Sequence, residues 1–268
     1  MRSGTTVIHR ALCAARNSNP YISESWFLSD LFNLYTWNMT RFDVRHKDQF
    51  GDPSKLTEVI YLNLQYYLDM ISAKYENPEL LILKHPELTP HFLEMKKLLP
   101  QAKFLVIVRD PRDVIASIMD VNIKHQADNI KSPHSHFKTM REYCGFYAGY
   151  YQLVLGQRQA FGKDLMFVRY EDIVTEPAKS FERIGKFSGA IYEGDEMKRF
   201  DPAQSESLNL EREVRLKDKF SGAFWSDLYT KDLSPTSIGK HKKSLSATET
   251  QEIEKILGQI GRMFEYWK

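Results

Sequence analysis

The chain has 268 residues, of which 42% are hydrophobic and 27% charged, and its formal net charge at pH 7 is +2. This charge excludes a strongly basic nucleic-acid-binding protein, and no apolar run approaches the ~20 residues of a membrane span. The N-terminus has no signal-peptide pattern and the two cysteines form no disulfide framework or metal spacing, so we expect one cytoplasmic domain over residues 1–268 without a metal site.

The chain opens with Met1-Arg2-Ser3-Gly4-Thr5-Thr6, which precedes an apolar helical pattern. This order predicts a loop that leads into a helix over about residues 6–16. A helix N-terminus presents unpaired backbone N–H groups and the positive end of the helix dipole, so it binds phosphate or sulfate. Arg2 adds a permanent positive charge. No Lys follows the Gly, as a Walker A loop requires, and by itself this short run is equally compatible with an ordinary turn.

Extended and helical patterns alternate over the next 80 or so residues. We expect a short strand near Tyr21, helices over about 24–38 and 55–75, a strand over 80–84 and a helix over 90–98. Glu24 follows the first strand, and Lys84-His85 ends the second. Both acid–base candidates also have structural explanations. Glu24 would stabilise the N-terminus of the next helix, and His85 would bond to backbone at a strand end.

A second anion site is predicted after the β-branched run over residues 103–108, which suits a buried parallel strand. Arg109 follows it directly, and Asp110-Pro111 starts a helix at once. Ligands of open α/β sheets bind at the carboxyl ends of strands, and Ser117 lies about two turns along this helix. Arg109 and Ser117 would therefore suit a phosphate. The alternative is an ion pair of Arg109 with Asp110 or Asp113.

The remaining sequence continues the alternation. We expect helices over about 111–120, 138–161, 177–188 and 247–263, and a strand over 165–169. Residues 121–137 are polar and interrupted by Pro133, which predicts a flexible segment, and residues 200–240 have no clean period, which predicts a lid. Short strands that alternate with helices predict a parallel sheet with helices on both faces.

Together these motifs resemble those of the PAPS-dependent sulfotransferases, which use 3′-phosphoadenosine 5′-phosphosulfate (PAPS). Residues 2–6 are similar to the 5′-phosphosulfate loop of this family, and Arg109 with Ser117 is similar to its 3′-phosphate motif. Residues 167–172 resemble its Arg-Tyr-Glu-Asp segment, and residues 237–241 resemble the element that closes over the nucleotide. The resemblance spans nearly the whole chain, in order.

The resemblance implies a three-layer, P-loop-like α/β fold and transfer of a sulfuryl group from PAPS, without a metal, to a hydroxyl or amine of a small molecule, carbohydrate or peptide. In this reading residues 121–137 lie on the substrate side and 200–240 close over the nucleotide. His241 stands where the family has Trp. The residues that would bind PAPS are Arg2, Ser3, Gly4, Thr5, Thr6, Arg109, Ser117, Tyr170, Ser237, Gly239 and Lys240.

One departure concerns the start of the sheet. The family places a strand before the phosphate loop, whereas Met1 already lies inside the motif. We therefore expect the sheet to lack its first central strand, and an upstream signal or anchor stays open.

The resemblance offers two candidates for the general base. Glu24 occupies the place where Golgi-type and bacterial relatives carry a catalytic Glu, and His85 lies near the catalytic His of cytosolic relatives. The run Lys84-His85-Pro86 fits better the Lys-x-Pro pattern of Glu-using relatives, in which the Lys contacts the sulfate. We therefore prefer Glu24 as the base, with Lys84 on the sulfate and Arg2 on the leaving oxygen that bridges to the 5′-phosphate.

Two other functions are open at this stage. A P-loop kinase for nucleotides or small molecules would need a Lys after the loop Gly and a Mg²⁺-binding carboxylate, and we see neither. A non-catalytic interaction domain with the nucleotide-binding fold is the second. The sequence indicates neither the acceptor nor the oligomeric state.

Overall fold

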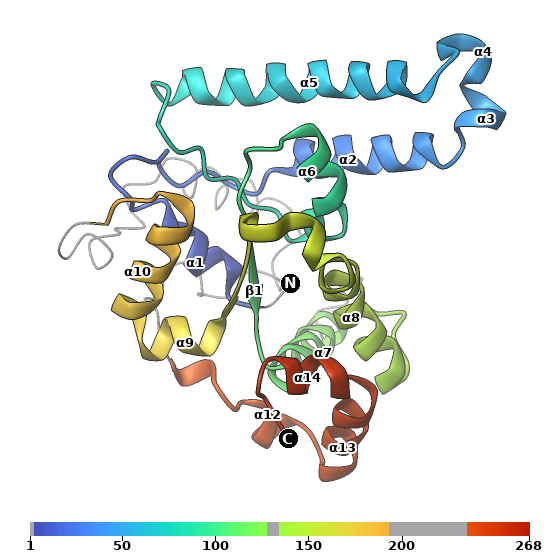
Figure 1. The fold of residues 1–268 in the computed structure, drawn as a ribbon. Coiled ribbons are helices and arrows are strands. Elements are labelled where there is room, and N and C mark those ends of the chain that lie inside the picture. The colour runs from blue at the N-terminus through green and yellow to red at the C-terminus, as the bar shows by residue number, and fades with distance from the viewer. Residues whose placement is uncertain (1–2, 128–133, 193–234) are drawn as a thin grey trace.

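The computed structural model describes residues 3–127, 134–192 and 235–268 (Figure 1). Within these ranges the sheet has two parallel strands, β1 (Phe104–Val108) and β2 (Leu165–Arg169). They pair from Phe104 opposite Leu165 to Val108 opposite Arg169. Their carboxyl ends lie at the same edge, so the residues that follow β1 and β2 leave the sheet as neighbours.

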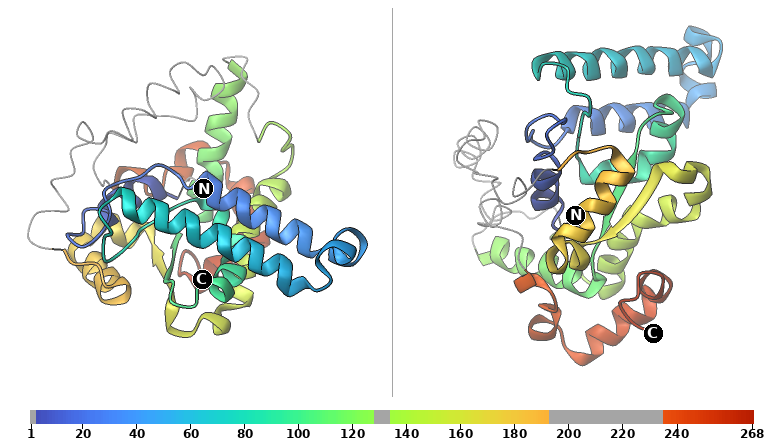
Figure 2. Two further views of the ribbon diagram at one scale, coloured as in Figure 1. Left: turned by 90° about the horizontal axis from the view of Figure 1, so that it is seen from above. Right: turned by 60° about the vertical axis from the view of Figure 1, so that its left-hand side comes forward.

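Most of the described chain is helical, and Figure 2 shows these helices from two further directions. No helix among the described residues is long and apolar enough to cross a membrane. The elements other than β1 and β2 are, in chain order, α1 (Thr5–Leu12), α2 (Trp26–Met39), α3 (Phe42–Arg45), α4 (Lys47–Phe50), α5 (Pro53–Lys74), η1 (Pro86–His91), α6 (Phe92–Leu98), α7 (Pro111–Ala127), α8 (Met140–Gly156), η2 (Arg158–Asp164), α9 (Tyr170–Thr175), α10 (Pro177–Ser188), η6 (Pro235–Ser237), α12 (His241–Ser244), α13 (Ala247–Ile256) and α14 (Gly258–Met263).

The sheet is covered by helices on both faces, as the sequence predicts. Side chains alternate along a strand, so Ile107 and Val168 point to one face and pack with apolar residues of α1, α9 and α10. Val106 and Val108 point to the other face and pack with residues of α7, α8, α13 and α14. These three layers confirm the α/β arrangement (Figure 1).

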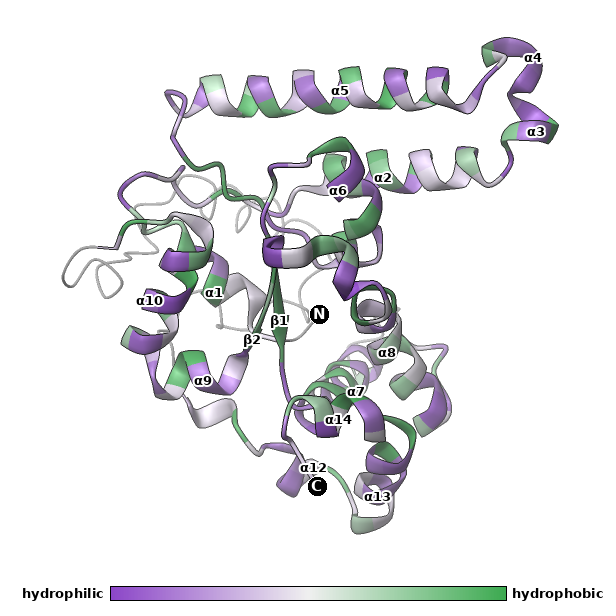
Figure 3. Ribbon diagram, viewed as in Figure 1, coloured by the Kyte–Doolittle hydropathy of each residue, from purple (hydrophilic) through white to green (hydrophobic). Residues whose placement is uncertain are grey.

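Helices α2 and α5 form a long antiparallel pair that projects from the sheet (Figures 1 and 2). Asp52 caps α5 by accepting a hydrogen bond from the Ser54 N–H at 2.7 Å, and Pro53 occupies the first helical position. The facing sides bury Leu28, Phe32 and other apolar residues, whereas Figure 3 shows apolar and polar residues mixed along the rest of both helices. Glu24 precedes Ser25, the N-cap of α2, so it lies at the N-terminal end of this pair.

The predicted strands near Tyr21 and over residues 80–84 are wrong in detail. Among the described residues, a single parallel bridge forms there, between Ser18 and Leu80. The buried side chain of Asn19 supplies the next hydrogen bonds: its Oδ1 accepts from the Ile82 N–H at 2.5 Å and its Nδ2 donates to the Ile82 carbonyl at 3.2 Å. The amide side chain of Asn19 thus forms the hydrogen bonds with Ile82 that the backbone of a neighbouring strand would otherwise form. The segments remain adjacent, and Ser25 N–H donates to Lys84 O at 3.0 Å.

Two predicted boundaries are also corrected. Helix α7 continues to Ala127, so the first part of the expected flexible segment 121–137 is helical; Asn122 is buried there and donates to the Tyr143 hydroxyl at 2.9 Å. The expected final helix is divided at Leu257 into α13 and α14. Of the expected lid over 200–240, residues 235–240 belong to the described chain, and residues 200–234 lie outside it.

Candidate functional site

The loop before α1 is held from both sides. Gly4 is the N-cap of α1 and has a φ of 74°, and a Cβ added there would overlap the ring of Tyr170. Ser3 is buried, and its Oγ lies 3.3 Å from the Tyr151 hydroxyl, which donates to Ile107 O at 3.1 Å. The first hydrogen bond inside α1 runs from Ile8 N–H to Gly4 O, so the N–H groups of the first turn have no acceptor within the helix and suit an anion.

We expect Gly4→Ala to destabilise the protein by roughly 2–4 kcal/mol, because it combines a left-handed residue with a clash against Tyr170. Gly189→Ala is the matched control, since Gly189 is also left-handed, with a φ of 86° and a ψ of 6°, and has nothing within 4 Å of an added Cβ. The control should cost about 1–2 kcal/mol, the backbone part alone. Thermal unfolding measures both, at about 2–4 °C per kcal/mol. Equal losses would mean that Tyr170 moves aside freely.

Glu24 and Lys84 meet at the first turn of α1. Lys84 Nζ lies 2.5 Å from Glu24 Oε1 and 3.4 Å from Thr6 Oγ1. The side chains of Glu24 and Lys84 are only 16% and 13% exposed, so each charge needs the other. The structure therefore brings together one residue of the loop motif and two of the predicted catalytic residues.

His85 borders this pair in a defined tautomer. Its Nδ1 accepts a hydrogen bond from the Glu87 N–H at 3.3 Å, so the ring proton of neutral His85 is on Nε2. Nε2 lies 4.0 Å from Glu24 Oε2 and has no hydrogen-bond partner among the described residues. Burial lowers the pKa of His85, and the edge-on ring of Trp26 is 4.4 Å away. His85 is therefore a neutral donor at neutral pH.

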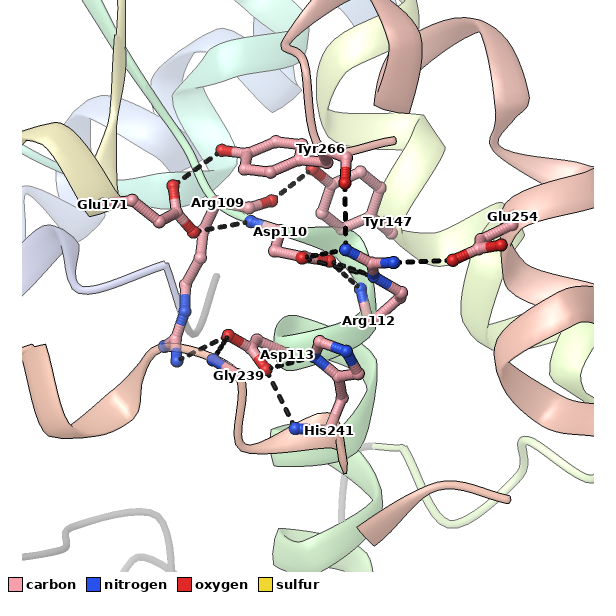
Figure 4. Close-up of polar contacts among 10 residues, drawn as sticks. All are labelled: Arg109, Asp110, Arg112, Asp113, Tyr147, Glu171, Gly239, His241, Glu254 and Tyr266. Carbon is pink, nitrogen blue, oxygen red and sulfur yellow. Dashed lines mark hydrogen bonds and ion pairs between the residues drawn. The ribbon is translucent and has the colours of Figure 1, made fainter. Parts of the chain in front are cut away.

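Arg109 leaves β1 into a buried polar cluster (Figure 4). Its Nη2 donates to Ser237 O at 2.6 Å and lies 3.9 Å from Asp113 Oδ2. Its guanidinium carbon is 4.7 Å from the centre of the Tyr170 ring. The structure thus places Arg109 beside Tyr170 and the late segment that contains Ser237. The ion pair with Asp113 is present as a long contact.

The remaining predicted site residues lie in different environments. Ser117 is half-buried two turns along α7, and Lys240 is exposed beside Gly239. His241 is buried and donates from Nδ1 to Asp113 Oδ1 at 2.7 Å, so it is held by a carboxylate at the position of the family Trp. Arg2 lies outside the described residues. In the described ranges no group of His, Cys, Asp and Glu is arranged to hold a metal ion.

A network that the sequence reasoning missed supports the strand ends (Figure 4). The buried carboxylate of Glu171 accepts from the Asp110 N–H at 3.0 Å and from the Tyr266 hydroxyl at 2.9 Å, and burial raises the pKa of Glu171. Arg112 pairs with Asp110 at 2.7 Å and with Glu254 at 2.6 Å. Asp110 therefore forms its ion pair with Arg112. Arg109 instead lies over the ring of Tyr170. The only sequence signal was the Arg-Tyr-Glu-Asp run at the end of β2.

Comparisons with known proteins agree with one another. The family model described as "Sulfotransferase family" matches residues 1–194. The sulfotransferase domain from the Synechococcus PCC 7002 olefin synthase superposes with a TM-score of 0.56 at 18% identity, over 96% of this chain and 91% of that one. The sulfotransferase domain from the curacin biosynthetic pathway gives 0.58 at 20% identity, over 96% and 94%. These two structures show a shared fold. No curated protein matches the sequence.

Proposed function

Because this chain belongs to the sulfotransferase family, we propose that it transfers a sulfuryl group from PAPS to a hydroxyl or amine of an acceptor. One observation carries the proposal: Lys84 contacts both Glu24 and Thr6. A carboxylate that can accept a proton is thereby linked, through one ammonium group, to a helix N-terminus that suits a sulfate or phosphate. Small molecules, carbohydrates and peptides are the proposed acceptor classes.

PAPS supplies the activated sulfuryl group, and the remaining work is positioning and charge stabilisation. The first-turn N–H groups of α1 and the hydroxyls of Thr5 and Thr6 would hold the 5′-phosphate. Lys84 Nζ lies within 3.4 Å of Thr6 Oγ1, where it would stabilise charge on the transferred group and on the departing oxygen. Gly4 lets the loop approach Tyr170, because a side chain there would overlap its ring. Arg2 is proposed for the same anion.

Glu24 is the proposed general base. Neutral His85 carries its proton on Nε2, the nitrogen nearer Glu24, and so has no lone pair there to take a proton from the acceptor. Its N–H lies where it can orient the second oxygen of Glu24. Lys84 donates to Oε1 of Glu24. The second oxygen, Oε2, would therefore be the one that accepts the proton from the acceptor.

We expect His85→Asn to lower kcat by no more than about tenfold, because Asn retains an acceptor for the Glu87 N–H and loses only the Nε2 donor. His85→Gln is the complementary variant, since its amide can replace the Nε2 donor, and it should stay closer to wild type. Initial rates of sulfuryl transfer at saturating PAPS measure the effect. An inactive His85→Asn enzyme would contradict an orienting role and favour a histidine base.

Thermal unfolding with nucleotides tests the proposed function. Adenosine 3′,5′-bisphosphate (PAP), the product left by PAPS, should raise the Tm; at 100 times its Kd it contributes about 2.7 kcal/mol. ATP with Mg²⁺ is the control and should shift the Tm far less. A PAP shift would be followed by an acceptor screen with PAPS. A shift by Mg²⁺-ATP without one by PAP would favour a kinase, and PAP binding without transfer to any acceptor would favour an interaction domain.

A further inference from the structure

A short segment, residues 237–241, is fastened to one buried carboxylate; we call this segment the latch (Figure 4). Asp113, in the first turn of α7, is 1% exposed. Its Oδ2 accepts from the Gly239 N–H at 2.8 Å. Its Oδ1 accepts from the His241 N–H at 2.9 Å and from His241 Nδ1 at 2.7 Å. One carboxylate therefore accepts three hydrogen bonds from the latch.

The latch in turn contacts the groups proposed for the nucleotide. Ser237 O accepts from Arg109 Nη2 at 2.6 Å, and the guanidinium of Arg109 lies over Tyr170. Tyr170 covers Gly4 at the start of α1. A chain of direct contacts thus runs from the latch through Arg109 and Tyr170 to the loop that would hold the 5′-phosphate.

Within the part of the chain that the structure describes, Asp113 accepts hydrogen bonds from Gly239 and His241, and Arg109 donates one to Ser237. Within the latch, Ile238 and Lys240 are exposed, and the two short helices that share its end residues, η6 and α12, have three and four residues. Such a segment buries little apolar surface, so its local stability rests on hydrogen bonds. Bonds to an ionised carboxylate are the stronger kind, and an unmatched buried carboxylate would be costly. Lys240 lies between the two anchored residues, so its backbone is fixed on both sides.

We propose that Asp113 is a positioning residue that holds the latch against Arg109, so that Arg109 and Lys240 face the 3′-phosphate of the nucleotide together. This inference rests on the proposed function, and it assigns Asp113 no contact with the nucleotide. Loss of the carboxylate should therefore weaken recognition of the 3′-phosphate and spare the 5′-phosphate site at α1.

Asp113→Asn tests the inference, because it keeps the size of the side chain and turns one acceptor oxygen into an N–H₂ group that faces the donors of the latch. Asp120→Asn, at an exposed position of the same helix, is the control. Calorimetry with PAP and with AMP, which lacks only the 3′-phosphate, measures recognition. We expect Asp113→Asn to weaken PAP binding roughly tenfold or more and AMP binding by less than about twofold.

Amide hydrogen exchange without nucleotide measures the latch itself. In Asp113→Asn the N–H groups of Gly239 and His241 should lose protection, while β1 and β2 keep theirs. His241→Ala should lower the ratio of PAP to AMP affinity in the same direction, and His241→Asn, whose amide can replace Nδ1–H, should restore most of it. Failure of this rescue would overturn the part assigned to His241.

The outcomes separate the two proposals. If wild-type protein does not bind PAP, the proposed function fails, and the role of Asp113 in nucleotide recognition fails with it. If wild-type protein binds PAP but Asp113→Asn leaves the ratio of PAP to AMP affinity unchanged, only this inference is overturned. Equal losses for both nucleotides, or loss of exchange protection across β1 and α7, would make Asp113 a general structural residue and would also overturn it.

Discussion

Glu24→Gln is expected to lower kcat for sulfuryl transfer by about 10²–10⁴-fold, the range typical of a lost general base. The substitution preserves the shape of the side chain and a hydrogen bond to Lys84, but it removes the ability to accept a proton. PAP affinity should change by less than about twofold, because the proposed role of Glu24 is in the chemical step. Initial rates at saturating PAPS, together with calorimetry of PAP binding, measure the two effects.

Glu87→Gln is the matched control for Glu24. Glu87 is a neighbouring carboxyl whose pKa is raised by burial and by the nearby charges of Glu24 and Asp30, so its neutralisation alters the local charge without removing the proposed base. It should retain activity within about tenfold of wild type. If Glu24→Gln is close to wild type and His85→Asn is inactive, the base is His85.

A pH profile alone cannot separate these two bases. A Glu24 base loses activity as the pH falls and the carboxylate is protonated. Burial lowers the pKa of His85 from its usual value, so a histidine base would also lose activity only below about pH 6.5. Both profiles therefore fall on the acid side, and the substitutions decide between them.

The strands and helices that the sequence predicts well are those with a strong local pattern. The β-branched run Phe104–Val108 forms β1, and the region predicted as a helix over 55–75 forms α5. The segment over 80–84 has a similar apolar pattern, but within the described ranges it pairs as a strand at one position only. Its partner is the side chain of Asn19, about 60 residues earlier, and hydropathy does not reveal such a contact.

The candidate site also has one part that the sequence predicts and one part that it does not. The places of Glu24, Lys84 and Arg109 at the ends of extended segments follow from the order of motifs along the chain, and the structure brings Glu24 to Lys84. The supports of the site do not follow from the sequence. The sequence indicates Asp113 only as a possible partner of Arg109, whereas its main contacts are with a segment 126 to 128 residues later. Such anchors depend on tertiary contacts that no local pattern encodes.

Arg109→Ala is the second prediction with a large expected effect. A charge-assisted contact with the 3′-phosphate is worth about 1.5–3 kcal/mol, so PAP affinity should fall roughly 10- to 150-fold. AMP lacks this phosphate, and its affinity should fall by less than about twofold. Calorimetry with the two nucleotides measures the ratio directly, and thermal unfolding shows whether the variant is folded.

Arg112→Ala is the control for Arg109. Arg112 lies close by but is committed to Asp110, to Glu254 and to the carbonyl of Tyr266, so its loss should lower the Tm and leave the ratio of PAP to AMP affinity unchanged. Arg109 differs because its contacts are with the latch and with Tyr170, both beside the proposed nucleotide site. Equal weakening of PAP and AMP by Arg109→Ala would assign Arg109 to the support of Tyr170 and the latch, because a residue that binds the 3′-phosphate must distinguish the two nucleotides.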